Sequence, residues 1–421
     1  MQKNKNLKLF YLAYIIMGFT IPIFDPLYPY FANNFHVGYD KIGIVFFFGS
    51  LTGIISIVIA GIISDILPLR KIFLWSFAIS FAGFAVFNIF QNFAGLTVTV
   101  IIVNMGIMIF WPAVYSKVFH DYKENYSMMY VKLDRFYYLN TALGPLLISL
   151  LLYLNLSPRY IFTLLLLLFF ILFILFYRFY KDKTSNISNA ENDIPDLKDS
   201  KKNLKHDLSK GTVSKIKNKE NNSIFKKITK FFSPTVIFAN LSLMLFAGVL
   251  TGTSSWLTTY FTSFNIAISF SSILVSVYWV FTFIGLQIIS KALNYLIEEK
   301  ILFYGGIISI ISLTCFSFTN IIYIKIMFLA MVAMSISGIY ALCGAITVRA
   351  NPKSAGTASG FSLGMGLVGG LIVQPVIGFV AQYLSKRYIP YVLIIMGVFG
   401  TILSAILLKI SLDKGRDRIK L

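Results

Sequence analysis

Long apolar runs separated by short polar segments account for most of this chain. Twelve such runs can be drawn, each close to the roughly 20 apolar residues that a helix needs to cross a bilayer. Lipid offers backbone groups no hydrogen-bond partners, so the pattern predicts an all-α protein of membrane-spanning helices. The predicted spans are 8–32, 42–63, 72–92, 95–116, 136–155, 159–180, 234–262, 268–290, 301–319, 321–347, 356–383 and 389–410.

Composition agrees with the pattern. Of 421 residues, 57% are hydrophobic and 13% are charged, whereas soluble domains carry roughly 25% charged residues. The first apolar run is too long for a cleaved signal peptide, contains Pro22, Pro26 and Pro29, and lacks a small-residue cleavage site. It therefore predicts a first span.

The net charge of +20 could suggest nucleic-acid binding, but its distribution favours membrane topology instead. Outside the central polar segment, most Lys and Arg residues lie in the terminal segments and in every second loop. The opposite loops and span ends hold Lys41, Arg159, Lys325, Lys386 and Arg387. By the positive-inside rule, both termini are expected in the cytoplasm of a cell that carries the protein in its plasma or inner membrane, with no nucleic-acid partner.

A polar segment over 181–233 interrupts the apolar pattern. It is rich in Lys, Asn, Ser and Asp and is expected to be mostly disordered. Its end, 224–232, spaces apolar residues three to four apart between lysines, which predicts a short amphipathic helix on the membrane surface; a regulatory partner site is the alternative. The segment divides the chain into 1–180 and 234–421, each with six spans.

The two parts resemble distant repeats. Tyr30-Phe31 matches Tyr260-Phe261, and Pro145 matches Pro375, both at an offset of 230 residues. Two six-helix bundles related by an axis along the membrane normal are one known transporter layout. We therefore predict a pseudo-two-fold arrangement of two bundles.

The segment from Gly61 to Lys71, GIISDILPLRK, resembles the signature between helices 2 and 3 of the major facilitator superfamily. The Gly, the Asp four residues later and the closing basic pair match, whereas Ile66, Pro68 and Leu69 depart from the pattern. Further similarities lie at the start of the fifth span, at the end of the fourth, and in the loop and helix of the eleventh: Arg135, Asn140, Gly144 and Pro145; Trp111-Pro112-Ala113; and Pro352, Lys353, Gly356, Ser359 and Gly360 with the glycines up to Gly378.

The resemblance implies a cytoplasmic gate. Gly61 would allow close helix approach, and Asp65 with Arg70 and Lys71 would hold the gate by contacts with the start of the eleventh helix. A simple charged turn is the alternative. Arg135 belongs to the same family-like set.

Pro145 should bend the fifth helix, because proline removes a backbone hydrogen bond. The Gly144-Pro145 pair could act as a hinge or be an inert kink.

Asp25 is the one acidic residue well inside a predicted span. An acidic residue in a span is costly and usually serves function, and loss of solvation disfavours its charged form, so it could exchange protons. A solvated position near the outer interface is the alternative, because Asp25 follows Lys8 by 17 residues, or about 26 Å of helix.

Other polar and aromatic residues in the spans could line a binding site. Amides in membrane bundles often join helices, and Trp and Tyr often form interface belts, so each has a structural alternative. The fourth span lacks the embedded Arg of many proton-coupled drug exporters. The candidates are Asn104, Trp111, Asn140, Asn240, Trp256, Tyr260, Tyr278, Trp279, Gln287 and Gln374.

These observations favour a secondary transporter, not an enzyme, that exports small amphipathic compounds with proton coupling. Uptake of a sugar or neutral metabolite is the alternative, and a transporter-like sensor or scaffold is the alternative of another class. An organic anion is not favoured, because no Lys or Arg is expected at mid-depth. We expect a monomer without cofactor or metal, driven by a proton gradient, since no nucleotide-binding G-x-x-x-x-G-K-S/T motif occurs.

Overall fold

The computed structural model describes residues 2–64, 67–121, 133, 136–181, 231–351 and 355–415, and every regular element in these ranges is a helix. Twelve helical segments are long and apolar enough to cross a membrane, and each coincides with a predicted span. The predicted division at Thr319-Asn320 is confirmed, because a helix ends at Phe318 and the next begins at Ile322. The prediction of an all-α polytopic protein is therefore confirmed.

In the first six spans, nine helices have bounds within the described residues, and residues 136–141 are helical as well. The nine helices are α1 (Gln2–Thr20), η1 (Ile21–Ile23), η2 (Asp25–Leu27), α2 (Tyr28–Asn34), α3 (Tyr39–Ser64), α4 (Leu69–Ile89), α5 (Phe93–Asp121), α7 (Leu143–Tyr153) and α8 (Arg159–Phe179). The first four form one broken span. The fifth span includes residues 136–141 and turns at Ala142 before α7 begins. The position of this turn agrees with the bend predicted from Pro145. Proline has no backbone N–H, so the helical hydrogen bond from residue 145 to the Thr141 carbonyl is missing.

The last six spans are built from eight helices. They are α12 (Pro234–Thr262), α13 (Ile268–Ala292), α14 (Glu298–Phe318), α15 (Ile322–Ile336), α16 (Ile339–Ala350), α17 (Ala355–Tyr383), η4 (Lys386–Tyr388) and α18 (Ile389–Asp413). The tenth span is α15 plus α16, which a turn at Ser337-Gly338 separates.

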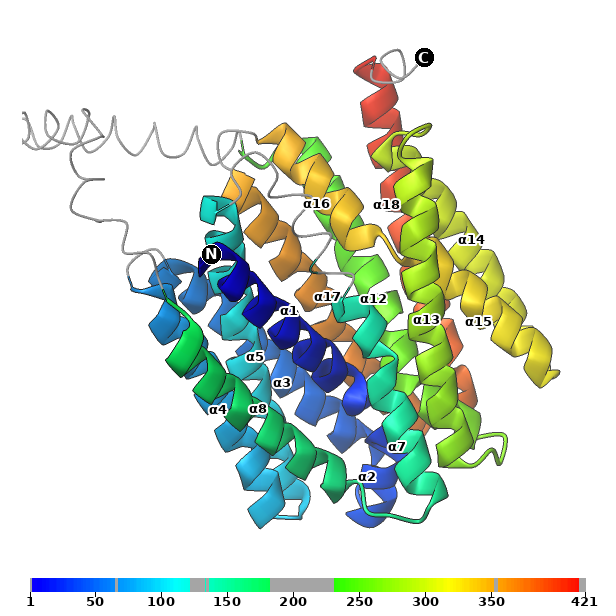
Figure 1. The fold of residues 1–421 in the computed structure, drawn as a ribbon. Helices are drawn as coiled ribbons and strands as arrows, with labels where there is room; N and C mark the ends of the chain where they lie inside the picture. Colours follow the sequence, from blue (N-terminus) through cyan, green and yellow to red (C-terminus); the bar gives the residue numbers. More distant parts are fainter. Residues whose placement is uncertain are drawn as a thin grey trace, which may run out of the picture.

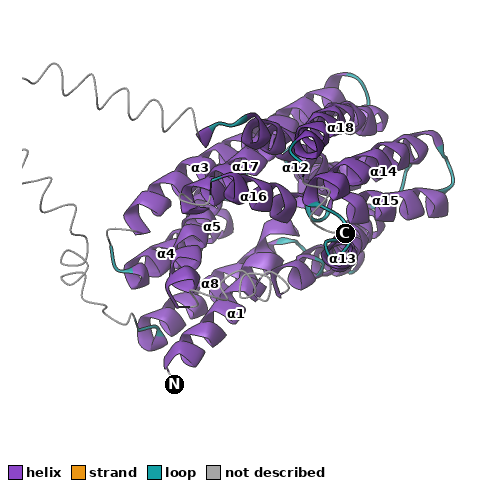
Figure 2. Ribbon diagram, turned by 90° about the horizontal axis from the view of Figure 1, so that it is seen from above, coloured by secondary structure: helices purple, strands orange, loops and turns teal. Residues whose placement is uncertain are grey.

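The helices form a single bundle with the two termini at the same end (Figure 1). We call this the terminal end, and the end that carries α2 and the α7–α8 turn the distal end. Helices α3, α4, α5 and α8 pack together, as do α12, α14, α17 and α18. Contacts between the two groups of spans come mainly from α3 against α17, α7 against α13 and η2 against α12. Figure 2 gives the view from above, down the bundle.

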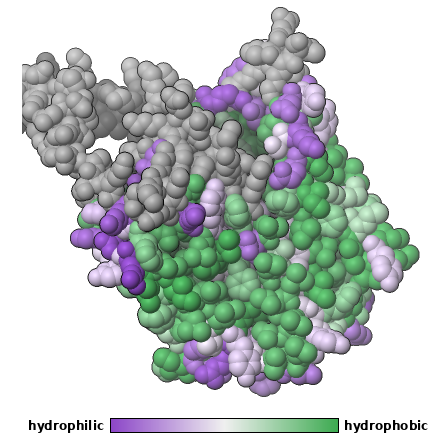
Figure 3. All heavy atoms as spheres, in the orientation of Figure 1, coloured by the Kyte–Doolittle hydropathy of each residue, from purple (hydrophilic) through white to green (hydrophobic). Residues whose placement is uncertain are grey.

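The surface carries a broad apolar belt. Hydrophobic residues cover the middle of the face in Figure 3, and hydrophilic residues gather toward its two ends. Large apolar side chains such as Ile59, Phe170 and Phe399 are half exposed on the outside of the bundle. Such a belt suits a lipid environment, because exposed apolar patches of this extent are rare on soluble monomers.

Several predicted features lie outside the described residues. These are Asp65, Arg135, Pro352, Lys353, residues 182–230 of the polar segment and, with them, most of the predicted amphipathic helix.

Candidate functional site

Asp25 lies at the break in the first span. Pro22 lies in η1 and Pro26 in η2, two short 3-10 helices that replace the α-helix between Thr20 and Tyr28. Proline removes backbone donors and fixes φ, which is why the α-helix does not continue here. The break carries Asp25 inward, and its side chain is buried with 9% exposure. The alternative of a solvated Asp25 at the outer interface therefore does not describe this structure.

A chain of hydrogen bonds connects Asp25 to two helices of the C-terminal six spans. The Ser255 hydroxyl on α12 donates to Asp25 Oδ1 at 2.8 Å, and Gln374 Nε2 on α17 donates to Ser255 Oγ at 3.2 Å. Gln374 Oε1 in turn accepts from Trp256 Nε1 at 2.8 Å and from the Tyr28 hydroxyl at 3.3 Å. We call Asp25, Tyr28, Ser255, Trp256 and Gln374 the Asp25 network. All five side chains are buried, so the network is a buried polar contact between the two parts of the chain.

Two glycines let the helices around this network approach closely. A Cβ on Gly378 of α17 would lie 2.7 Å from the Tyr39 carbonyl oxygen of α3, and a Cβ on Gly43 would lie 2.6 Å from the Gln374 carbonyl oxygen. Real Cβ atoms do not approach so closely, so α3 and α17 can cross here only because both positions are Gly. The crossing places Gln374 within reach of Tyr28.

Further contacts join the two parts at the distal end. Gln382 Oε1 accepts from the Tyr39 backbone N–H at 2.9 Å, and the Ser149 hydroxyl donates to the Ser269 carbonyl at 2.7 Å. Near the terminal end, by contrast, Gly61, Gly344, Gly360 and Gly364 have no described atom within 4 Å of where a Cβ would lie. The close approach predicted for Gly61 is thus absent from the described part of this structure, which is sealed at its distal end.

The remaining aromatic candidates divide into two clusters. Trp111 on α5 packs edge-on against Tyr14, at 5.1 Å between ring centroids, and against Tyr137 at 5.5 Å. Trp279 on α13 packs against Tyr278 at 5.8 Å, and the Tyr278 hydroxyl donates to the Leu250 carbonyl at 3.2 Å. Trp279 Nε1 is buried and has no hydrogen-bond partner among the described residues, so it could donate to a bound solute.

The amide candidates other than Gln374 lie outside the Asp25 network. Asn104 donates to the Val100 carbonyl, and Asn140 donates to the Phe136 carbonyl, each within its own span. Asn240 donates to Thr347 Oγ1 at 2.8 Å and joins α12 to α16. Gln287 is half-buried on α13. None of the four is part of the Asp25 network.

The described gating candidates contact their own half of the chain. Arg70 donates to the Tyr177 carbonyl on α8 and lies over the Tyr177 ring at 5.3 Å, while Lys71 is exposed. A Cβ on Gly144 would lie 2.7 Å from the Phe19 carbonyl oxygen, so this glycine permits the close packing of α7 on α1. Asp65, on which the predicted gate centres, and Arg135 fall outside the described residues, so the gate stays a prediction.

One charged residue was missed by the sequence reasoning. Lys325, expected at a loop or span end, is 2% exposed inside α15. Its Nζ donates to the Tyr260 hydroxyl and to the Phe316 carbonyl, both at 2.7 Å. A lysine near a span end ordinarily extends toward water, and only the side chains of α12 and α14 around it reveal that this one does not.

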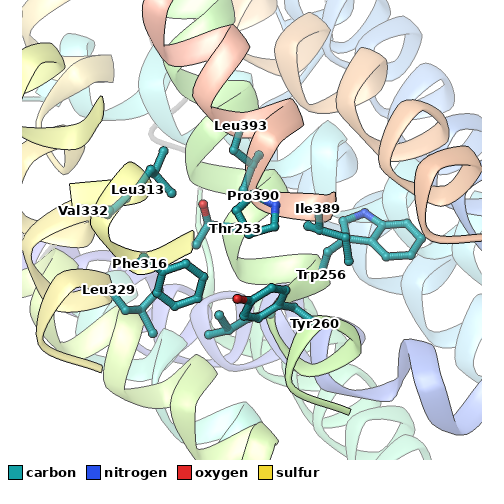
Figure 4. Close-up of a pocket in the computed structure, with 11 residues that line it drawn as sticks. Thr253, Trp256, Tyr260, Leu313, Phe316, Leu329, Val332, Ile389, Pro390 and Leu393 are labelled. Carbon is teal, nitrogen blue, oxygen red and sulfur yellow. The ribbon is translucent and has the colours of Figure 1, made fainter. Parts of the chain in front are cut away.

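An apolar pocket lies beside this lysine, between α12, α14, α15 and α18 (Figure 4). Tyr260 and Phe316 both contact Lys325 and line the pocket. Trp256 lines it from α12 as well, so one side chain belongs both to the pocket and to the Asp25 network. Trp256 and Tyr260 are four residues apart on α12, which places them on one face of the helix.

Comparison with known proteins adds the family. Residues 10–338 match the model of the Major Facilitator Superfamily, whereas no curated protein matches the sequence. The fold is similar to a mutant of the nucleoside transporter NupG, with a TM-score of 0.69 and 14% identity over 97% of this chain and 100% of that chain. It is also similar to a bacterial homolog of the human lysosomal transporter Spinster in an inward-facing, occupied conformation, with a TM-score of 0.70 and 12% identity over 97% of each chain.

A peptide transporter POT mutant in complex with sulfate is similar too, with a TM-score of 0.69 and 16% identity over 98% of this chain and 95% of that chain. Identities this low show the fold and leave the solute open. The family match covers most of the twelve spans. This chain therefore belongs to the Major Facilitator Superfamily and is a multi-pass membrane transporter.

Proposed function

We propose that this protein exports small amphipathic compounds in exchange for protons, with Asp25 as the proton-carrying residue. In this proposal both termini face the cytoplasm of the cell membrane, so the distal end is the outer side and the structure is closed outward. Residues 1–180 and 234–421 are the two units that rock about the central site, joined by the segment 181–233. The protein works as a monomer.

The observation that carries the proposal is the Asp25 network. Asp25 is buried, no described Lys or Arg lies within ion-pair distance of it, and its carboxylate accepts a hydrogen bond from the Ser255 hydroxyl. Burial of an ionised carboxylate without a cation is strongly unfavourable. The sealed state therefore favours protonated Asp25, and an opening that admits water at the distal end favours the ionised form. Proton binding and closure of the outer side are thereby linked, because each favours the other.

Export follows from this linkage in two steps. Protons from outside neutralise Asp25 in the outward-open state and allow the distal seal to form. The protein then opens toward the terminal end. There Asp25 releases its proton and a solute enters, and both events favour the return to the outward-open state. The solute would pack against the two aromatic clusters around Trp111 and Trp279, which suit flat apolar groups better than a sugar phosphate.

Uptake of a sugar or neutral metabolite is the second candidate, since the same linkage can drive solute and proton in one direction. A transporter-like sensor remains the candidate of another class, and it depends on the polar segment 181–233. If the protein still moves solute after deletion of that segment, the sensor hypothesis loses its basis.

A transport assay tests the proposal directly. Cells that lack their own exporters are loaded with a panel of amphipathic dyes, and dye accumulation is compared for wild type, Asp25→Asn and empty vector, with and without an uncoupler. Asp40→Asn is the matched control. Asp40 is also an aspartate at the distal end, but it is more exposed, and among the described residues its side chain accepts a hydrogen bond from the Tyr383 hydroxyl at 3.3 Å.

The proposal expects lower accumulation with wild type and with Asp40→Asn, and near-vector accumulation with Asp25→Asn or with uncoupler. If Asp25→Asn exports as wild type does, at equal expression, Asp25 is not the coupling residue. If wild type matches empty vector for every dye, export of amphipathic compounds is wrong, and uptake of neutral nutrients is assayed in its place.

A further inference from the structure

Helix α12 carries a line of hydroxyl groups that leads from Asp25 toward the distal end. Thr258 and Thr262 follow Ser255 by three and seven residues, a spacing that places side chains on one face of an α-helix. Ser255 donates to Asp25 from this face, and η2 and α2 pack against the same helix. We call Ser255, Thr258 and Thr262 the hydroxyl stripe. It lies on the face that α12 turns toward the first six spans.

Thr258 is the unusual member of the stripe. A threonine inside a membrane helix often donates its hydroxyl to a carbonyl one turn earlier, as Thr253 does to the Val249 carbonyl at 2.7 Å. Thr258 is fully buried, and its hydroxyl has no hydrogen-bond partner among the described residues. A buried hydroxyl without a partner is unfavourable. The sealed state therefore leaves the hydrogen-bonding capacity of Thr258 unused.

Ser271 on α13 adds a second hydroxyl of this kind at a similar level. Helices α12 and α13 are joined by residues 263–267 and run in opposite directions, and the Tyr278 hydroxyl contacts the Leu250 carbonyl. Ser271 lies seven residues from Tyr278 toward the distal end, on the same face of α13. Thr258 lies eight residues beyond Leu250 in that direction, so both are about 10–12 Å from the contact along the bundle. Ser271 too is fully buried and unpartnered in the described part of the chain.

The neighbouring Thr259 provides a contrast. Its hydroxyl is as buried as that of Thr258 and likewise has no partner within the described ranges. Thr259 follows Gly252 by seven residues and so shares its face. A Cβ on Gly252 would lie 2.9 Å from Val373 Cγ2 and 3.1 Å from Ile377 Cδ1 of α17. Thr259 therefore faces the inside of the C-terminal six spans, whereas Thr258 faces the contact between the two parts.

We propose that the hydroxyl stripe and Ser271 form the route by which water, and with it protons, reaches Asp25 when the distal end opens. This inference rests on the proposed role of Asp25 and adds the residues that serve its proton step. In the open state, water bonds to the Thr258 and Ser271 hydroxyls and connects Ser255 with the outside, where Thr262 is partly exposed. A hydronium ion on this route gives its proton to the Asp25 carboxylate and leaves a water molecule behind.

The same groups interrupt the route in the sealed state. A proton passes only between groups within hydrogen-bond reach of each other or of a shared water. Among the described residues the chain has a gap at Thr258, whose hydroxyl is bonded neither toward Asp25 nor toward the distal surface. The sealed state thus holds the proton on Asp25 until the terminal end admits water. Without such a gap, protons would cross the protein without solute.

Cysteine labelling tests for water at the stripe without any transport. Thr258→Cys and Thr259→Cys are made after Cys315 and Cys343 have been replaced, and purified protein in a neutral maltoside detergent is treated with a charged methanethiosulfonate reagent. The reagent attacks the thiolate, which forms in water and is disfavoured in an apolar site. We expect Thr258→Cys to react much faster than Thr259→Cys. Gln374→Leu, which weakens the seal, should speed the reaction of Thr258→Cys by about tenfold or more and leave Thr259→Cys unchanged.

Proton uptake by proteoliposomes tests the hydroxyl itself. Thr258→Val keeps the shape of the side chain and removes the hydroxyl, whereas Thr258→Ser retains the hydroxyl. Loss of one hydrogen bond to water should slow uptake about fivefold in Thr258→Val, and Thr258→Ser should remain near the wild-type rate. The melting temperature of Thr258→Val should not fall, because valine removes a buried hydroxyl that has no partner. Thr259→Val is the matched control and should keep both the stability and the uptake of the wild type.

The outcomes separate this inference from the proposed function. Equal labelling of Thr258→Cys and Thr259→Cys in the Gln374→Leu background would overturn the water route, and so would an unchanged uptake rate in Thr258→Val. If the wild type takes up no protons at all, the proposed proton coupling of Asp25 fails, and the labelling still decides whether the stripe admits water.

Discussion

Asp25 and Ser255 are 230 residues apart in the chain and form a hydrogen bond of 2.8 Å. Their separation equals the offset that relates Tyr30-Phe31 to Tyr260-Phe261. The two residues thus occupy corresponding positions of the two repeats, one in the first span and one in the seventh. A pseudo-two-fold axis brings equivalent positions together only close to itself, so this pair lies near the axis of the predicted repeat arrangement. A proton on Asp25 is therefore well placed to influence both halves.

Replacement of Ser255 by Ala should weaken the seal. Ser255 donates to Asp25 and accepts from Gln374, so its loss leaves two buried polar groups without this partner. We expect a stability loss of about 1–3 kcal/mol and a lower exchange of protons for solute. Thermal unfolding of the purified protein and proton uptake by proteoliposomes measure the two effects.

Thr251→Val is the control for Ser255→Ala. The Thr251 hydroxyl donates to the Ala247 carbonyl of its own helix at 2.7 Å. The control should leave proton uptake unchanged. Equal effects of the two substitutions would show that any lost hydroxyl on α12 has the same consequence.

Gln374→Leu should shift the protein toward a state open at the distal end. The substitution removes the acceptor for Trp256 Nε1 and Tyr28 and the donor to Ser255, all across or beside the seal. Three weak hydrogen bonds of about 1 kcal/mol each can change a two-state population by tenfold or more.

Spin labels on the distal turns can measure this shift. Leu156→Cys and Ala267→Cys place labels at exposed positions of the two halves, after Cys315 and Cys343 have been replaced. A longer distance population should appear with Gln374→Leu. An unchanged distance distribution would mean that the seal does not depend on the hydrogen bonds of Gln374.

Gly378→Leu should prevent the distal end from closing. A side chain here would collide with the Tyr39 carbonyl and with Gly43, both of which are backbone. Overpacking of this kind costs about 1–3 kcal/mol, which corresponds to a loss of transport of about five- to 150-fold if closure is required. Dye export and the same spin-label distances provide the measurement.

Gly364→Leu is the control for Gly378→Leu on the same helix. No described atom lies within 4 Å of its Cβ position, so the leucine has room in this state. A stronger defect in Gly364→Leu than in Gly378→Leu would contradict the importance of the distal crossing.

Arg349→Gln should destabilise the C-terminal six spans at their terminal end. Arg349 on α16 donates to Glu298 and to Glu299 at the start of α14, both at 2.7 Å, and Glu299 is fully buried. Loss of a hydrogen bond to a buried carboxylate costs about 1.5–3 kcal/mol, whereas the pair with Glu298 is more exposed and contributes less.

A double-mutant cycle checks the origin of the Arg349 effect. If the loss comes from the buried carboxylate, Glu299→Gln in the Arg349→Gln background should restore part of the thermal stability, and Glu298→Gln should restore less. Additive losses in both double variants would show that the arginine acts through other contacts.

Much of the fold followed from the sequence. The spans could be predicted because hydrophobic length is a local property that the bilayer fixes. The turn near Pro145 followed from the missing backbone N–H of proline. The family resemblance rested on short local motifs such as GIISDILPLRK, which a single chain displays. Asp25 stood out because an acidic residue among apolar ones is conspicuous without any structure.

What the sequence could not determine was which side chains meet. Gln374 is linked to Asp25 through Ser255, whereas Asn104 and Asn140 bond to their own spans, although all three are amides in apolar runs. Lys325 lies among three rings rather than at a polar surface. Helix periodicity gives the face on which a residue lies, but the rotation of each helix relative to its neighbours comes from packing between segments hundreds of residues apart. Only the tertiary structure decided, therefore, that Asp25 is part of a buried seal between the two halves and that Trp256 belongs both to that seal and to the pocket beside Lys325.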